Sequence, residues 1–126
     1  MRLLLDTHAF LWWCADDPRL AQVERKAIRD GANDVFLSAA SVWEMAIKQT
    51  LGRLKLPEPP SAAVARLGIA RLPVAFEHAE ATVVLPPLHR DPFDRLLVAQ
   101  AKIEGLTLVT RDPLIRSYPG VAFLPA

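Results

Sequence analysis

Residues 91–112 read DPFDRLLVAQAKIEGLTLVTRD and combine a helix with the strand that follows it. Asp91 is a natural N-cap, Pro92 suits the first helical position, and a glycine directly after Glu104 ends the pattern. Apolar residues recur through the segment at the spacing of one helix face. We therefore expect a helix from Pro92 to Glu104 and a short strand over Thr107–Thr110 (TLVT).

The rest of the chain repeats this alternation of helix-period segments and short apolar runs. We expect further strands over residues 2–5, 34–38, 71–74 and 121–124. We expect further helices over residues 7–15, 18–30, 39–51, 61–67, 77–85 and 113–118. Strands and helices that alternate in this way predict an α/β domain with a mostly parallel sheet and right-handed crossovers. The proline-rich stretch KLPEPPS (55–61) is expected to link two helices within that domain.

Length and composition indicate one globular domain over residues 1–126. Half of the chain (52%) is hydrophobic, and 15 Lys and Arg balance 14 Asp and Glu to a net charge of +1, which excludes a disordered or uniformly basic protein. The single cysteine, Cys14, lies in an apolar run, so we expect it to be buried, and no disulfide can form within the chain. No apolar run approaches the roughly 18 residues of a membrane span. We therefore expect a cytoplasmic protein without membrane contact.

Three aspartates occupy the same kind of position, at the end of a strand or the start of a helix. Asp6 follows the apolar run LLL, Asp94 lies in the first turn of its predicted helix, and Asp112 follows the strand TLVT. The carboxyl ends of parallel strands meet at one edge of a sheet, where ligands of open α/β domains bind. We therefore expect these three side chains to converge.

Glu44 is a fourth candidate acid, in the middle of a predicted helix. Ala40, Ile47 and Leu51 lie four residues before it and three and seven after it, and this spacing places the carboxylate on the apolar, inward face. Asp94 repeats the pattern on its own helix. A cluster of carboxylates repels itself unless their pKa values rise or a cation lies among them. Such hard oxygen ligands suit Mg²⁺ or Mn²⁺, whereas the His and Cys spacing of a zinc site is missing.

Each of these acids also has a structural interpretation, which the sequence leaves open. Asp6 and Asp112 stand where helix N-caps belong, and Asp91 with Asp94 resembles a capping box. Glu44 is able to pair with the lysine four residues later. Taken singly, these interpretations explain each residue as well as a catalytic role does. The set of four favours a functional site, because two acids on inward helix faces lack a local reason to be buried.

Four segments carry a resemblance to a known family, and they occur in that family's order. They are LLLDTHAFLWW (3–13), LSAASVWEMAIKQTLGRLKL (37–56), HRDPFDRLLVAQA (89–101) and LVTRD (108–112). Together they resemble the signature segments of PIN-domain ribonucleases, and most closely those of VapC-type toxins of type II toxin-antitoxin pairs. The resemblance covers nearly the whole chain. It implies a PIN-like three-layer α/β fold, in which helices flank a central, mostly parallel sheet.

The resemblance also implies roles for the acids. Asp6 matches the metal-binding aspartate at the end of the first strand, Glu44 the glutamate of the central helix, and Asp94 the aspartate ahead of the LLVAQA run. Asp112 matches the fourth and most variable acid, and Asp91 replaces Asp94 if the register differs by one turn. In the family such acids hold Mg²⁺ or Mn²⁺, and the protein is commonly a homodimer. A cognate antitoxin inserts a segment that blocks the site.

Hydrolysis of RNA phosphodiesters fits these residues, because a divalent ion held by carboxylates activates water and neutralises charge on the phosphate. Residues 48–71 contain five basic residues and one acid, and the candidate contacts to RNA phosphates are Lys48, Arg95 and Arg111. The two arginines each adjoin a candidate acid, so contact with the antitoxin or pairing with the carboxylates are alternatives. His89 is expected to be a loop residue near the rim of the site, without a catalytic role.

Two other functions are compatible with parts of the pattern. A receiver domain or a haloacid-dehalogenase-like phosphatase also ends its first strand in aspartate. The receiver requires a phospho-accepting aspartate near the middle of the chain, where residues 45–57 contain none, and the phosphatase requires an aspartate two residues after Asp6, where His8 stands. The other alternative is a catalytically silent PIN-like module that binds RNA or protein. The presence of all four acids weighs against it.

Overall fold

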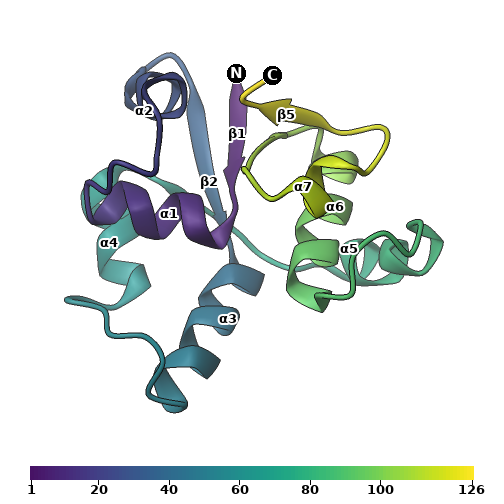
Figure 1. Ribbon diagram of the computed structural model, residues 1–126, viewed down its shortest axis with the longest axis horizontal. Helices are drawn as coiled ribbons and strands as arrows, with labels where there is room; N and C mark the ends of the chain where they lie inside the picture. The colour runs from purple at the N-terminus through teal and green to yellow at the C-terminus, as the bar shows by residue number, and fades with distance from the viewer.

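The computed structural model describes residues 1–126 and shows a five-stranded, entirely parallel sheet with helices on both faces (Figure 1). The strand order is β3-β2-β1-β4-β5. The strands are β1 (Arg2–Leu5), β2 (Asp34–Ser38), β3 (Ala70–Leu72), β4 (Thr107–Val109) and β5 (Ala122–Leu124). The helices are α1 (Thr7–Cys14), α2 (Gln22–Arg29), α3 (Ala39–Thr50), α4 (Pro60–Leu67), α5 (Phe76–Ala81), the 3₁₀ helix η1 (Thr82–Val84), α6 (Pro92–Glu104) and α7 (Pro113–Arg116). The expected α/β architecture is confirmed.

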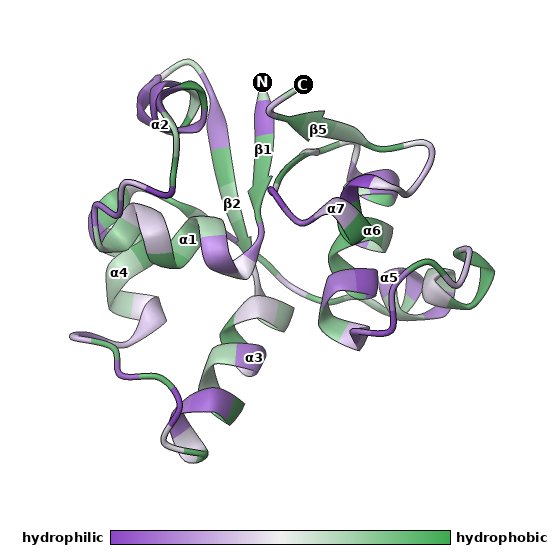
Figure 2. Ribbon diagram, in the orientation of Figure 1, coloured by the Kyte–Doolittle hydropathy of each residue, from purple (hydrophilic) through white to green (hydrophobic).

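The first strand, β1, lies at the centre of the sheet and divides the hydrophobic core into two clusters. Leu3 and Leu5 pack on one face with residues of α1, α2 and α4, whereas Leu4 packs on the other face with residues of α6 and α7. All three leucines are fully buried. Successive side chains of a strand point to opposite faces, so an unbroken apolar run suits a strand that is covered on both sides. Figure 2 shows this run as a continuous apolar stretch between helices of mixed character.

Helix α6 begins and ends at the residues that the sequence predicts. Asp91 accepts hydrogen bonds through Oδ1 from the backbone N–H groups of Phe93 (2.8 Å) and Asp94 (3.2 Å). Gly105 follows Glu104 in the left-handed conformation, with φ of 64°. An N-cap of this kind stabilises a helix by about 1 kcal/mol, and glycine adopts the left-handed conformation without strain. These two ends fix Asp94 in the first turn of the helix.

Two predicted helices differ most from the structure. The helix expected over 18–30 begins only at Gln22. The segment before it forms a turn, in which Oδ1 of Asp17 accepts the backbone N–H of Arg19 at 2.9 Å. The helix expected over 77–85 is divided into α5 and η1, and the chain leaves the helical conformation ahead of two prolines.

Helix α3 buries a different set of residues from the expected one. Glu44 lies on the inward face as predicted and is 7% exposed, but the apolar residues that share this face are Ala40 and Met45. Ile47 and Leu51, expected on the same stripe, are 36% and 59% exposed. The reason is that the second half of α3 extends beyond the edge of the sheet (Figure 1). This half of the helix therefore presents apolar side chains to solvent.

Cys14 is exposed at the last residue of α1, so the expectation that it is buried is wrong. Only the residues near the start of this helix, Ala9 and Phe10, belong to the buried core. None of the helices combines the length and the apolar character that crossing a membrane requires.

Candidate active site

The end of β1 places the first predicted acid at the carboxyl edge of the sheet. The backbone N–H of Asp6 donates to the carbonyl oxygen of Val109 in β4 (3.1 Å), and its Oδ1 accepts the N–H of Ala9 (2.7 Å), which caps α1. The residue is only 5% exposed. Burial raises the pKa of the Asp6 carboxyl above its usual value, and the Thr110 hydroxyl and the Ala9 N–H oppose this only in part. Asp6 is therefore both a helix cap and a buried acid.

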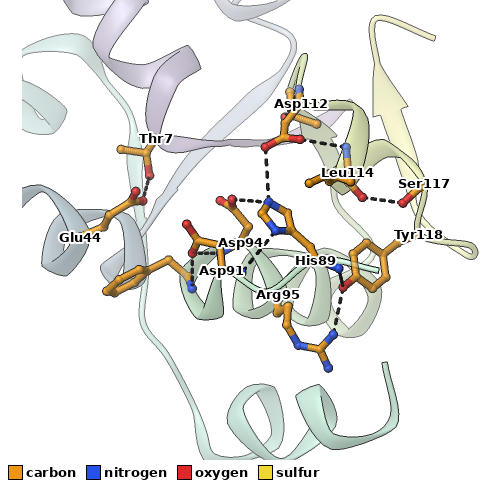
Figure 3. A network of polar contacts seen from close by, with 12 residues as sticks. Thr7, Glu44, His89, Asp91, Asp94, Arg95, Asp112, Leu114, Ser117 and Tyr118 are labelled. Atoms are coloured by element: carbon orange, nitrogen blue, oxygen red, sulfur yellow. Dashed lines mark hydrogen bonds and ion pairs between the residues drawn. The ribbon is translucent and has the colours of Figure 1, made fainter. Parts of the chain in front are cut away.

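Glu44 reaches the same edge from α3. Its Oε1 accepts a hydrogen bond from Thr7 Oγ1 at 2.7 Å, and its Oε2 pairs with Lys48 Nζ at 2.9 Å. Thr7 is the first residue of α1, so this buried contact joins the start of α1 to the middle of α3 (Figure 3). The pairing of Glu44 with the lysine four residues later is confirmed, and it coexists with burial of the acid.

Asp94 has a strongly perturbed acidity. Burial raises the pKa of its carboxyl to about 7, and the negative charges of Asp91, Glu44 and Asp6 add to this rise, while His89 opposes it. These charge effects indicate that Asp6 at the end of β1 and Glu44 of α3 lie near Asp94 of α6. The Asp94 carboxyl therefore holds its proton more tightly than an isolated aspartate does.

His89 lies between Asp94 and Asp112 (Figure 3). Its Nε2 is 3.0 Å from Asp94 Oδ2 and 3.4 Å from Asp112 Oδ2. Asp112 also caps α7, because its Oδ1 accepts the N–H of Leu114 at 2.8 Å. One ligand atom from each of the three residues lies within 4.8 Å of the other two. The structure thus brings Asp94 and Asp112 together, and the expectation that His89 lies at the rim is wrong, since its side chain is 13% exposed.

Comparison with known proteins identifies the family of this chain. The family model of the PIN domain matches residues 3–121. The chain belongs to the PIN domain family. Ribonuclease VapC22 of Mycobacterium tuberculosis is 32% identical over 119 residues, which cover 92% of this chain and 91% of that protein. Ribonuclease VapC16 of the same organism is 36% identical over 89 residues, which cover 58% of this chain and 63% of that protein.

Two solved structures share the fold of this PIN domain. VapBC2 from Rickettsia felis, bound to a DNA fragment from its promoter, has a TM-score of 0.71 at 16% identity and covers 98% of this chain and 97% of that chain. The DNA-bound VapBC from Salmonella typhimurium has a TM-score of 0.69 at 14% identity and covers 98% and 96%. At such identities the likeness concerns the fold alone. It confirms the expected PIN-like arrangement of helices around a parallel sheet.

Arg95 does not face the acids of this PIN domain, although it follows Asp94 in sequence. Its guanidinium donates hydrogen bonds to the carbonyl oxygens of Thr82 (2.7 Å) and Pro86 (2.9 Å) and to the Tyr118 hydroxyl (3.0 Å). Adjacent residues of a helix project in different directions, and Figure 3 shows this side chain on the far side of α6 from the carboxylates. A structural contact therefore replaces the expected contact with phosphate, and it ties the segment before α6 to that helix.

Lys48 and Arg111 stay close to acids. Lys48 pairs with Glu44 and keeps 38% of its side chain exposed. Arg111 precedes Asp112 and forms an ion pair with Glu24 of α2, with 2.7 Å between Nη2 and Oε1. Glu24 is buried, and the sequence does not single it out. Arg111 is thereby anchored at the edge of the sheet with part of its guanidinium accessible to solvent.

The donor atoms of the cluster fit a hard divalent cation. Asp6, Glu44, Asp94 and Asp112 offer carboxylate oxygens, which are the ligands that Mg²⁺ and Mn²⁺ prefer. Two of these carboxyls have a raised pKa because they are buried, and negative neighbours add to the shift. A cation among them would offset the repulsion and favour the charged forms. The residues present therefore suit the metal that the PIN family implies.

Proposed function

We propose that this PIN domain is a divalent-metal-dependent endoribonuclease that serves as the toxin of a toxin-antitoxin pair and acts on RNA in the cytoplasm. The observation that carries the proposal is the partly buried carboxylate cluster around Asp94, whose pKa is raised to about 7, in a chain 32% identical to Ribonuclease VapC22. A structural role explains each acid singly, as a cap or as part of an ion pair. It does not explain why acids from separate elements lie close together despite their mutual repulsion.

The acids are proposed to share the work of holding the cation. Asp6 and Asp94 are the main ligands, while Glu44 and Asp112 hold water or a second ion. Asp94 is preferred to Asp91, because an oxygen of Asp94 lies within 4.8 Å of ligand atoms of Asp112 and His89, and Asp91 is not part of that group. A bound Mg²⁺ or Mn²⁺ would activate water near neutral pH and neutralise charge on the phosphate. In-line attack on the phosphodiester leaves a 3′-hydroxyl and a 5′-phosphate.

Neighbouring residues orient these acids and adjust their charge. Thr7 holds one oxygen of Glu44, and Lys48 holds the other and lowers the repulsion within the cluster. Asp94 must lose its proton before it binds a cation, and a pKa of about 7 makes that loss easy at neutral pH. We therefore expect cation binding to release a proton from the protein near pH 7.

Lys48 and Arg111 are the proposed contacts to RNA phosphates. Each pairs with an acid of the protein and keeps part of its side chain accessible, so each can also meet a phosphate at the edge of the sheet. Arg95 is left out of this proposal, because its donors are used by backbone carbonyls and by a tyrosine hydroxyl.

Two exposed apolar surfaces are proposed to bind partner proteins. A groove of about 670 Å³ lies between α3 and α4, and its lining includes Val42, Trp43 and Val64. We propose that the cognate antitoxin covers this groove, since α3 also carries Glu44. The helices α5 and η1 expose Phe76 and two valines almost completely, and a second copy of the chain is proposed to cover them in a homodimer.

RNA cleavage by the purified chain, freed of any antitoxin, tests the proposal. Cleavage is expected with Mg²⁺ or Mn²⁺, and EDTA is expected to stop it. The Asp94→Asn variant should cleave at least about 100-fold more slowly, because it removes a charged ligand. Asp34→Asn is the matched control, since it removes an exposed carboxylate at the opposite end of the strands and should keep the wild-type rate. In cells, new RNA 5′ ends should appear after expression of the wild-type chain but not after expression of Asp94→Asn. Equal cleavage by the two chains would refute the mechanism.

A further inference from the structure

We propose that His89 positions Asp94 and Asp112 by donating from Nε2 to both carboxylates, and that it is not itself a ligand of the cation. The inference rests on the proposed function, because it concerns two acids assigned there to the cation. His89 lies in the loop between η1 and α6, whereas Asp94 belongs to α6 and Asp112 to the segment after β4. The imidazole therefore connects acids from two separate parts of the fold.

The Nε2 atom of His89 lies near one carboxylate oxygen of each aspartate. It lies 3.0 Å from Asp94 Oδ2 and 3.4 Å from Asp112 Oδ2, and it is inaccessible to solvent. It is aligned for a straight hydrogen bond with neither of them. A nitrogen in this place is either a shared donor, with its hydrogen between the two carboxylates, or a lone pair directed at a cation that both carboxylates also bind.

The other ring nitrogen decides between these two states. Nδ1 of His89 faces the backbone N–H of Asp91 at a distance of 3.2 Å, so it accepts a hydrogen bond and carries a lone pair (Figure 3). A neutral imidazole holds one proton, which must then lie on Nε2. A metal ligand at Nε2 would require the opposite tautomer, with the hydrogen of Nδ1 directed at the N–H of Asp91. The geometry therefore favours a donor and disfavours a ligand.

The loop that carries His89 is held from both sides. The backbone N–H of His89 donates to the hydroxyl oxygen of Tyr118 at 3.1 Å, and the same oxygen accepts a hydrogen bond from Arg95 Nη1 at 3.0 Å. Asp91, which fixes the tautomer, is itself fixed as the cap of α6. The ring thus has a defined position before any cation binds, which is what a positioning residue requires.

The proposed role of His89 assigns a partner to each carboxylate oxygen of Asp94 and Asp112. His89 engages Oδ2 of Asp94 and of Asp112, while Oδ1 of Asp112 caps α7. The Oδ1 of Asp94 makes no hydrogen bond within the chain, so it is the oxygen offered to the cation. Partners that orient ligands in this way typically contribute about 10-fold to 100-fold to metal affinity.

Two spectroscopic measurements test the inference directly. In ¹⁵N NMR of the metal-free protein, His89 should show an unprotonated Nδ1 and a protonated Nε2, and the opposite tautomer would overturn the proposal. In pulsed EPR of the Mn²⁺-loaded protein, no ¹⁴N coupling from a directly bound imidazole should depend on His89. A coupling of that kind that is lost in His89→Gln would make His89 a ligand and the proposal wrong.

Substitutions give a second, independent readout in Mn²⁺ affinity measured by calorimetry. His89→Ala should weaken Mn²⁺ binding about 10-fold. In His89→Gln the amide nitrogen can occupy nearly the position of Nε2, so the Mn²⁺ affinity should stay within about threefold of wild type. His89→Asn places its amide near Nδ1 and should behave like alanine. His8→Gln is the control for the loss of an imidazole, because His8 is exposed, stacks on Trp12, makes no hydrogen bond to the acids and affects Asp6 only through its charge. Circular dichroism and the Tm of each variant check that it is folded.

The outcomes separate this inference from the proposed function. If the wild-type chain binds Mn²⁺ and cleaves RNA, but His89→Ala binds as tightly as wild type, only the positioning role is refuted. If the wild-type chain neither binds Mn²⁺ nor cleaves RNA, the proposed function fails, and the tautomer measured by NMR still decides whether His89 donates to the two aspartates.

Discussion

Raising the pH of the metal-free protein should destabilise its fold through Asp94. The pKa of this carboxyl is about 7 in the folded protein, against a usual value of 3.8. Between these two values the folded state binds more protons than the unfolded state, so the free energy of unfolding falls as the pH rises through this window and levels off above it. A difference of about three pKa units corresponds to a loss of up to about 4 kcal/mol.

The Asp94→Asn variant isolates this contribution, because asparagine has nearly the same shape and carries no charge. In EDTA, the stability of the variant relative to wild type should be greater at about pH 8 than at about pH 4, by up to about 4 kcal/mol. In thermal unfolding this corresponds to a relative rise in Tm of up to about 15 °C for a domain of this size. Urea unfolding at each pH, followed by fluorescence of the three tryptophans, measures the free energies.

Asp34→Asn, which removes an exposed carboxylate at the other end of the strands, controls for the loss of one negative charge. Mn²⁺ added at about pH 8 should raise the Tm of wild type and leave that of Asp94→Asn nearly unchanged, because the cation then has one ligand fewer. A stability difference between Asp94→Asn and wild type that is the same at both pH values would refute the reasoning, since the charge on Asp94 would then have no energetic consequence.

Three further substitutions test the contacts around the cluster. Thr7→Val removes the 2.7 Å hydrogen bond to Glu44 and should lower the free energy of unfolding by about 1–2 kcal/mol in urea titrations, and by clearly less when Glu44→Gln is already present. Arg95→Lys loses the planar fork that binds two carbonyls and should cost about 2 kcal/mol, while the Kd of the folded protein for RNA stays within about twofold; a selective loss of RNA binding would contradict its structural role. Asp91→Ala removes the cap of α6 and should cost about 1 kcal/mol with little change in Mn²⁺ affinity, whereas a loss of about 10-fold would identify Asp91 as the ligand.

The parts of the fold that depend on neighbouring residues are predictable from the sequence. Helix α6 is predicted to the residue, because its aspartate cap, its first-turn proline and its terminal glycine all act locally. The division between α5 and η1 is not predictable in this way. Carbonyl oxygens of η1 and of the residues after it bind Arg95, which lies on α6, so no pattern within the segment reveals the break.

The same distinction applies to the site. The convergence of Asp6, Asp94 and Asp112 follows from the topology of a parallel sheet, in which every strand ends at one edge. The place of His89 does not follow, because its loop is held by Tyr118 from the far end of the chain. Its one sequence signal is its position two residues before the N-cap of α6. From there its ring can accept a hydrogen bond from the Asp91 N–H and lie against the first turn of α6.

The division of the core by β1 has a consequence for when activity arises. Asp6 and Glu44 are carried by elements that pack with Leu3 and Leu5, whereas Asp94 and Asp112 are carried by elements that pack with Leu4. A nascent chain that ends before His89 has built the first half and has none of the acids of the second. The complete cluster exists only when both halves have closed on β1, so it forms only after Asp112 has been added to the chain and is lost when either half opens.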